Sequence, residues 1–398
     1  MSATAPIGSA ERIGELDVLR GFALMGVFIV HFVGGVFYQL SVDPEWQAIQ
    51  KADPIQHTVL LFSDLFFLDK ANTLFATLFG MGFWVMMERL KARGAEFERI
   101  YFRRLMILVL IGAINVVLVF PGDVLHVYAV LGMALLALRN IPAGVKLALG
   151  VILVVGGRVI GEFLLPGAQV GWKKFEAVQA AAFAKEEYWH WVITTGEAFV
   201  IREFVYGAFL GWGLYLFGRF LIGAWIMERG LMDRLGENLP TIRVLALIAL
   251  PLGLALDAIG LAIDEEFITG PQGAYEMIHP FSVPLQALGY ALVLILVFHS
   301  RWRGLVLIFA PVGRMALTAY VVHGAVLMAV FSPIGLGLAG VMRPATCLAF
   351  LIALFAFMTA GCHAWLARYR YGPLEYMWRW ATYGERPKFR LAPAPVAA

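Results

Sequence analysis

Arginine and histidine side chains interrupt an apolar stretch near the start of this sequence. Residues 15–35 read ELDVLRGFALMGVFIVHFVGG, with Asp17 and Arg20 near one end and His31 eleven residues after Arg20. A histidine can take up a proton near neutral pH, and an arginine can bind a phosphate or a carboxylate through paired hydrogen bonds. Together the two residue types suit a site that binds an anion and removes a proton from a second reactant.

Two later stretches repeat this combination. In FPGDVLHVYAVLG, Asp123 precedes His126 by three residues, so it can cap a helix and also orient the imidazole. In GRMALTAYVVHG, Arg314 and Thr318 are one helical turn apart, which predicts that they share a face of one helix, with Tyr320 close by. An arginine inside an apolar segment needs an anion, a carbonyl or water. We therefore expect a ligand or a buried partner at this position.

Each of these residues also has a purely structural interpretation. Arg20 can extend to lipid headgroups beside Asp17, and His31 can hydrogen-bond a neighbouring helix. Asp123 can serve as a helix cap alone. Asp257 has no partner in the neighbouring sequence, and His279 falls near the end of a segment, where we expect exposure to solvent.

The composition identifies the environment that must position these residues. Of the 398 residues, 61% are hydrophobic and 15% are charged, and the mean hydropathy is +0.77. A soluble domain is about half apolar and about a quarter charged. The sequence therefore predicts an integral membrane protein, and the net charge of +3 is too small to indicate a nucleic-acid partner.

Apolar runs long enough to cross a bilayer predict an all-α transmembrane bundle of about ten spans. About 20 apolar residues are needed for each span. The predicted spans are 16–40, 72–89, 104–120, 123–139, 145–165, 204–226, 242–263, 281–299, 305–330 and 344–366. The apolar piece 55–69 is expected to be interfacial or re-entrant.

Basic residues in the short connections predict that both termini are cytoplasmic. Short cytoplasmic loops are enriched in lysine and arginine. The connection after the second predicted span contains Arg89, Lys91, Arg93, Arg99, Arg103 and Arg104. Every second connection after it is also basic, whereas the connection around Asp264, Glu265 and Glu266 is acidic. In the basic tail we expect Tyr376, Trp378 and Trp380 at headgroup level and Arg379 among phosphates.

This orientation places Arg20 and His31 at different depths. Arg20 would lie at the cytoplasmic edge, and His31 would lie about 16 Å deeper at 1.5 Å per residue. Eleven residues amount to about three helical turns. One face of the first helix can therefore carry both side chains.

Four stretches together resemble a known family. LDVLRGFALMGVFIVHF, RRLMILVLIGAINVVLVFPGDVLHVYAVLG, GRMALTAYVVH and GPLEYMWRWATYG look like the successive blocks of the bacterial DUF418 family, the YeiB-like membrane proteins. The resemblance runs from residue 12 to about 384, within a single transmembrane domain over 1–398. Its parts are a four-helix part over 12–140, the fifth and sixth helices with a long outer connection over 141–235, a DUF418-like part over 236–384 and a flexible tail over 385–398.

The family is similar to the transmembrane acyltransferase superfamily, which includes the acyltransferase-3 proteins and the heparan-α-glucosaminide N-acetyltransferases. The resemblance implies transfer of an acyl group from cytoplasmic acyl-CoA, most simply acetyl-CoA, to a hydroxyl or amine of a glycan or another envelope component. In acyltransferase-3 proteins the first helix carries an Arg, ten residues and then a His, which is the spacing of Arg20 and His31. Acyl-CoA would be a substrate, and we expect no tightly bound cofactor and no metal.

The proposed roles follow from the needs of acyl transfer. A base removes the acceptor's proton, donors stabilise the oxyanion and cations bind the CoA phosphates. The candidate donors and cations are Arg20, Arg103, Arg104, Asn115, Arg314, Thr318 and Tyr320.

Three histidines are candidates for the general base. Many DUF418 proteins and the glucosaminide acetyltransferases have Asn at the position of His31, and the latter carry their catalytic His after the first helix. His57, followed by Asp64, is the nearest residue here. His126, with Asp123 beside it, is the third candidate. Asn115 stands where the family often has a histidine.

Two other functions compete with the enzyme. A transporter for a small polar or anionic solute would line its pathway with the same residues, and LALIALPLGLALDAIG has the Pro and Gly interruption found in broken helices. A non-catalytic membrane scaffold would suit the aromatic-rich tail. In each case we expect a multi-pass protein of the plasma (inner) membrane in contact with the lipid bilayer, and a homo-oligomer stays open.

Overall fold

The computed structural model describes residues 13–34, 44–164, 177–178, 187–202 and 208–391. The named elements in these residues are all helices. The five that are long and apolar enough to cross a membrane are Gly14–Val33, Phe97–Leu118, Leu239–Asp264, Ala274–Phe298 and Pro344–Leu366. Shorter apolar helices include Leu125–Ala137 and Ala316–Phe331. The predicted all-α, multi-pass membrane protein is therefore confirmed at this level.

Most predicted spans correspond to single helices. These are α1 (Gly14–Val33), α5 (Lys70–Ala92), α6 (Phe97–Leu118), α7 (Leu125–Ala137), α8 (Ala143–Leu164), α11 (Ala208–Glu228), α12 (Leu239–Asp264), α13 (Ala274–Phe298) and α17 (Pro344–Leu366). The piece predicted over 55–69 contains α4 (Pro54–Phe66), and residues 35–40 of the first predicted span lie outside the described residues. The sequence interpretation did not identify α3 (Pro44–Ala52), α10 (Tyr188–Val200) or α18 (Pro373–Tyr383) as helices.

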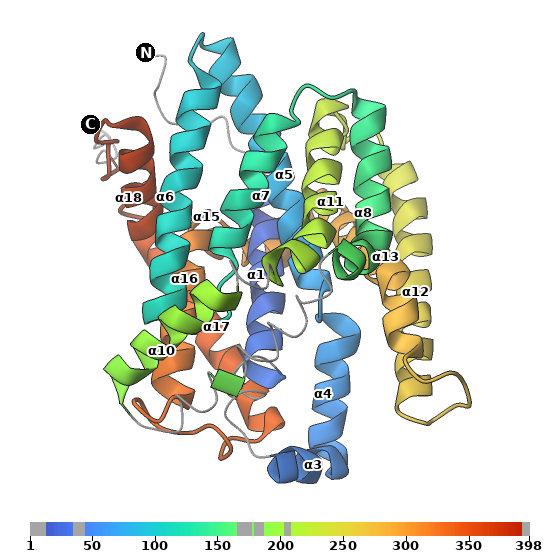
Figure 1. The fold of residues 1–398 in the computed structure, drawn as a ribbon. Helices are drawn as coiled ribbons and strands as arrows, with labels where there is room; N and C mark the ends of the chain where they lie inside the picture. The colour runs from blue at the N-terminus through green and yellow to red at the C-terminus, as the bar shows by residue number, and fades with distance from the viewer. Residues whose placement is uncertain (1–12, 35–43, 165–176, 179–186, 203–207, 392–398) are drawn as a thin grey trace.

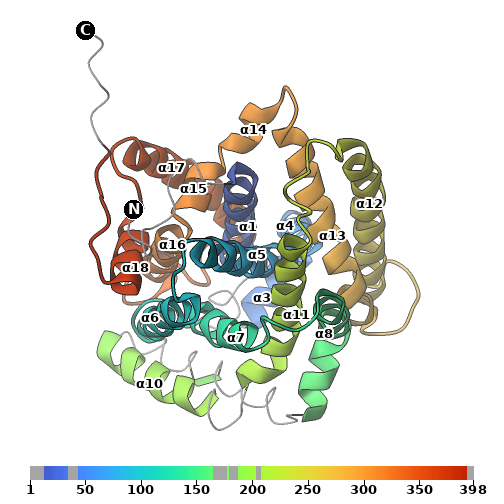
Figure 2. The same ribbon diagram turned by 90° about the horizontal axis from the view of Figure 1, so that it is seen from above.

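α1 and α5 lie near the middle of the bundle. α1 packs against α5, α15 and α17, and α5 also packs against α11. The pairs α8–α11 and α12–α13 complete one side, with α12 at the outside (Figures 1 and 2). The α5–α6 connection and α18 lie at one end of the bundle, called here the arginine-rich end, and α3, α4 and the α12–α13 connection lie at the opposite end (Figure 1).

The span predicted over 305–330 is broken into three helices. These are α14 (Arg303–Leu307), α15 (Ala310–Arg314) and α16 (Ala316–Phe331). The chain leaves helical geometry at Met315, with φ −112° and ψ 35°. The prediction of one continuous helix was wrong here, because hydrophobic length does not reveal a break. Arg314 ends α15 and Thr318 lies in the first turn of α16, so they do not share a face of one helix.

Two glycines allow the backbones of α1 and α15 to touch. A Cβ at Gly313 would overlap the carbonyl oxygen of Asp17, and a Cβ at Gly21 would overlap the carbonyl oxygen of Phe309, the residue before α15. Gly21 follows Arg20, and Gly313 precedes Arg314. The close approach of the two helices therefore brings the two arginines to the same place.

A buried ion cluster joins α5 to α12 and α13. Lys70 forms an ion pair with Asp257, and both side chains are fully buried. Nε2 of His279 lies 3.0 Å from a carboxylate oxygen of Asp69, and its Nδ1 lies 3.5 Å from one of Asp257. The Ser282 hydroxyl donates to Asp257 at 2.6 Å. Asp257 thus has partners far away in sequence, and the expectation that His279 is exposed was wrong, since it is 3% exposed.

We expect Gly313→Ala to destabilise the protein. The added Cβ meets main chain, which cannot rotate away, and overpacking of this kind costs roughly 1–3 kcal/mol. The matched control is Gly361→Ala on α17, where a Cβ has nothing within 4 Å. Thermal unfolding in detergent measures the difference, and a Gly313→Ala protein as stable as the control would contradict the packing argument.

We expect Lys70→Met to cost more stability than the double variant Lys70→Met/Asp257→Leu. Removing one partner of a buried ion pair leaves an uncompensated charge and costs roughly 3–5 kcal/mol, whereas replacing both partners by apolar residues can be close to neutral. Unfolding of the wild type, both single variants and the double variant forms a complete thermodynamic cycle. Strictly additive losses would show that the pair does not act as a unit.

Candidate functional site

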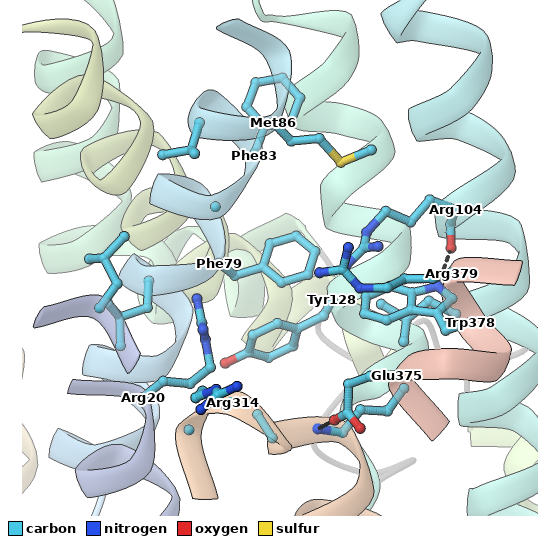
Figure 3. A pocket seen from close by; sticks show the side chains of 18 of the residues that line it. Arg20, Phe79, Phe83, Met86, Arg104, Tyr128, Arg314, Glu375, Trp378 and Arg379 are labelled. Carbon is cyan, nitrogen blue, oxygen red and sulfur yellow. Dashed lines mark hydrogen bonds between the residues drawn. The ribbon is translucent and has the colours of Figure 1, made fainter. Parts of the chain in front are cut away.

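A cavity of ≈ 290 Å³ opens among the helices of the arginine-rich end. Among the described residues, five arginines and two carboxylates line it. The arginines are Arg20, Arg89, Arg104, Arg314 and Arg379, and the carboxylates are those of Asp17 and Glu375. Figure 3 shows Arg20 and Arg314 on one side of the cavity and Arg104 and Arg379 on the other. Positive charge therefore exceeds negative charge around this space.

Arg20 and Arg314 are positioned by the α1–α15 contact. Arg20 donates a hydrogen bond of 3.2 Å to Asp17, one turn earlier on α1, as the spacing predicts. The carbonyl of Asp17 touches Gly313, so Arg314 must lie beside this pair. The contact between the two backbones therefore places the guanidinium groups of Arg20 and Arg314, which are far apart in sequence, in the same cavity.

Arg104 is held by α18. Its guanidinium carbon lies 3.4 Å from the centre of the Trp378 ring, and the indole N–H of Trp378 donates to the Arg104 carbonyl at 2.9 Å. Trp378 and Arg379, which we expected at headgroup level and among phosphates, both line the cavity. The outer face of α18 carries Met377 and Trp380, which are 59% and 39% exposed.

Glu375 caps the helix that follows the break. Its carboxylate accepts hydrogen bonds from the backbone N–H groups of Leu317 and Thr318 at 2.7 and 3.0 Å and from the Thr318 hydroxyl at 2.6 Å. A carboxylate at a helix N-terminus satisfies unpaired N–H groups and the helix dipole. One of the two carboxylates of the cavity is therefore committed to α16, and Thr318 serves this cap and is not part of the cavity lining.

The rest of the wall is apolar and aromatic. α5 contributes Phe75, Phe79 and Phe83, and α6 contributes Leu105 and Leu108. In this water-poor setting the interaction of arginines with a bound anion is stronger than at an open surface. The arrangement suits a ligand with an anionic group and an adjoining apolar part.

The start of α7 forms another part of the wall, through Leu125 and Tyr128. Tyr320 of α16 lies beside it, where the Val124 N–H donates to the Tyr320 hydroxyl at 3.4 Å. The Tyr128 hydroxyl donates to Asn72 at 2.9 Å. Phenolic hydroxyl groups therefore stand in the wall close to the N-terminus of α7.

Asp123, Asn115 and His126 form one buried group next to Tyr320. The Asn115 amide donates to Asp123 at 2.8 Å, and the Leu125 N–H donates to the other carboxylate oxygen at 2.8 Å. Nδ1 of His126 lies 3.4 Å from that same oxygen. Asp123 therefore accepts a hydrogen bond at the start of α7 and also lies beside the His126 imidazole. The structural interpretation, a helix cap, and the functional one, a group that orients His126, both fit its position.

His31 lies against a second histidine that sequence reasoning did not select. Its Nδ1 is 3.1 Å from Nε2 of His323 on α16. His323 is one turn beyond Tyr320, and their ring centres are 5.8 Å apart. Tyr320 lines the cavity, whereas neither His31 nor His323 does, so His31 is connected to the cavity wall through His323 and Tyr320.

Two candidate site residues, His57 and Arg103, do not line the cavity. Nε2 of His57, on α4, pairs with Glu265 at 3.0 Å. α4 and the α12–α13 connection lie at the end of the bundle opposite the arginine-rich end (Figure 1). Asp64 lies two turns further along α4, outside the membrane-spanning helices, where burial raises the pKa of its carboxyl group to about 6. Arg103 is exposed and is not among the lining residues, although it adjoins Arg104.

The structure therefore brings together part of the predicted set. Arg20, Arg104, Arg314 and Tyr320 share the cavity, and Asn115, Asp123 and His126 adjoin it. Within the described residues, no group of three or more His, Cys, Asp or Glu side chains could hold a metal ion. The sequence analysis counted Arg89 only as a topology signal, placed Arg379 among lipid phosphates and missed Glu375, although a carboxylate inside an otherwise basic tail was a usable signal.

Comparisons with known proteins agree with the whole-chain resemblance. The family described as "Protein of unknown function (DUF418)" matches residues 226–385. The chain is 30% identical to the uncharacterized protein YxaH of Bacillus subtilis (strain 168), with 96% of this chain and 97% of YxaH covered. It is 29% identical to the uncharacterized protein YeiB of Escherichia coli (strain K12), with 94% and 96% covered. No solved structure matches the chain. The chain belongs to the DUF418 family.

Proposed function

We propose that this protein is a membrane-embedded acyltransferase that takes its acyl group from cytoplasmic acyl-CoA and transfers it to a hydroxyl or amine acceptor, such as a glycan or another envelope component. The observation that carries the proposal is the cavity with five arginines at the arginine-rich end. In this proposal that end faces the cytoplasm, in about ten spans across the plasma (inner) membrane.

The cavity fits the parts of an acyl-CoA in order. Guanidinium groups bind phosphate oxygens in pairs, so Arg20, Arg314, Arg104 and Arg379 would bind the pyrophosphate from two sides (Figure 3). The apolar wall of α5 and α6 would contact the arm that carries the thioester. Tyr320, next to the N-terminus of α7, would donate to the thioester carbonyl oxygen as negative charge develops there.

The transfer needs a base on the acceptor side. The acceptor oxygen or nitrogen bonds to the carbonyl carbon, the carbon–sulfur bond breaks, and the acceptor's proton passes through the base to the departing sulfur. His31 is assigned this role because it lies deeper than Arg20 on the same side of α1 and contacts His323, the neighbour of Tyr320. His126 is the alternative, since Asp123 orients its ring beside Tyr320. His57 does not line the arginine cavity and pairs with Glu265 instead.

Transport of a small anion is the second candidate function. Discontinuous helices beside a charged cavity are typical of transporters, and the break between α15 and α16 borders this cavity. The break expected in α12 is not the one observed, because α12 continues through Pro251.

We expect Arg104→Gln to weaken CoA binding about 10-fold to 100-fold. A hydrogen bond to a charged group contributes roughly 1.5–3 kcal/mol, and about 1.4 kcal/mol is one factor of ten. Arg103→Gln is the matched control, because it removes the same charge from an exposed neighbour. Calorimetric titration of purified protein with CoA at fixed salt measures both. Equal losses in the two variants would mean that only general surface charge attracts CoA.

We expect His31→Ala to reduce transfer of labelled acetyl groups from acetyl-CoA to membrane acceptors about 10²-fold to 10⁴-fold, the usual contribution of a general base. Binding of acetyl-CoA should be retained, because His31 does not line the cavity. Undiminished transfer would remove His31 from the mechanism and leave His126 to be tested in the same way. A protein that binds no acyl-CoA but moves small anions into proteoliposomes would favour the transporter.

A further inference from the structure

We propose that His323 is a positioning residue that fixes the tautomer of His31 and leaves Nε2 of His31 as the nitrogen that accepts a proton. This inference deepens the proposed acyl transfer and rests on it for the catalytic role. The tautomer itself is a property of the two side chains and can be measured without any activity.

The backbone of α16 determines which ring nitrogen of His323 carries the hydrogen. Nδ1 of His323 lies 3.2 Å from the carbonyl oxygen of Tyr320. A carbonyl oxygen can only accept a hydrogen bond, so Nδ1 of His323 carries the hydrogen. Nε2 of a neutral His323 then carries the lone pair.

The surroundings of His323 favour the neutral ring. His323 is fully buried, with the Phe28 ring stacked on it at 4.0 Å between centres and 4° between planes. Phe32 and Phe120 contribute two further rings at 6.0 and 5.7 Å. A charge placed among aromatic rings and not balanced by a carboxylate is costly.

The hydrogen bond between the two rings then determines the tautomer of His31. Its Nδ1 lies 3.1 Å from Nε2 of His323. Since that Nε2 accepts, Nδ1 of His31 must donate, and Nε2 of His31 carries the lone pair. His31 is also the less buried ring of the pair. Two hydrogen bonds thus link the Tyr320 carbonyl to His323 and His323 to His31. They leave Nε2 of His31 as the basic nitrogen, on the side of the ring that points away from α16.

This arrangement gives His323 a role during the reaction. When Nε2 of His31 takes the proton of the acceptor, the positive charge spreads to Nδ1, and the hydrogen bond to His323 becomes charge-assisted and stronger. The imidazolium releases its proton again as the CoA thiolate, the leaving group, is protonated. A partner that holds the ring in one tautomer is needed throughout, as in other sites where a histidine acts as a base.

The test compares His323→Gln with His323→Leu. The amide oxygen of Gln can accept from Nδ1 of His31 in place of the imidazole, whereas Leu cannot. We expect His323→Leu to lower kcat roughly 10-fold to 100-fold, as when other functional histidines lose the group that orients them, with the KM for acetyl-CoA unchanged. His323→Gln should recover most of kcat. A general packing defect would not distinguish Gln from Leu in this direction, because Gln is the poorer apolar replacement.

The second readout is independent of turnover. In protein carrying ¹⁵N-labelled histidine, NMR distinguishes a protonated ring nitrogen from one with a lone pair, and His31→Gln assigns the His31 signals. We expect the lone pair on Nε2 of His31 in the wild type and in His323→Gln, and a mixture of tautomers in His323→Leu. A hydrogen on Nε2 of His31 in the wild type would overturn the inference, even if His323→Leu did not fold. The expected tautomer in a protein without acyl transfer would count against the proposed function alone.

Discussion

The contact between the backbones of α1 and α15 is the constraint on which the arginine cavity depends. Gly21 and Gly313 have no side chains to separate the two segments. The carbonyl oxygen of Asp17 therefore lies against Gly313, and the carbonyl oxygen of Phe309 lies against Gly21. Arg20 and Arg314 adjoin these glycines in sequence, and both side chains line the cavity. The break at Met315 then turns the chain so that Tyr320 and His323 face α1 and α7. A straight helix through this region would place these groups differently.

The arginines that line the cavity have protein partners of different kinds. α18 stacks Trp378 on Arg104, which offsets part of the cost of burying that guanidinium group. Glu375, which could neutralise another arginine, caps α16 with both oxygens. Asp17 pairs with Arg20 at 3.2 Å. In the proposed function, an anionic ligand would bind further arginines of the cavity.

The sequence was informative wherever the signal is local. Span lengths follow from apolar runs, the Asp17–Arg20 and Asp123–His126 contacts follow from their spacing of three residues, and α17 has the predicted bounds of 344–366. Contacts between distant segments were not readable from one sequence. The pairs Thr318–Glu375, His31–His323 and Lys70–Asp257 join different helices, and no periodicity encodes them. The break at Met315 was also missed, although Pro311 and Gly313 interrupt the apolar run just before it.

The ion cluster of Lys70, Asp257 and His279 has a consequence for how the protein is made. A buried lysine is costly in a membrane protein unless it is paired, and Lys70 leaves the ribosome well before Asp257 of α12 and Tyr275 of α13, its partners on these helices, are synthesised. The buried pair of Lys70 and Asp257 therefore forms only after the α12–α13 hairpin has been made, and a truncated chain that lacks this hairpin would leave Lys70 without Asp257.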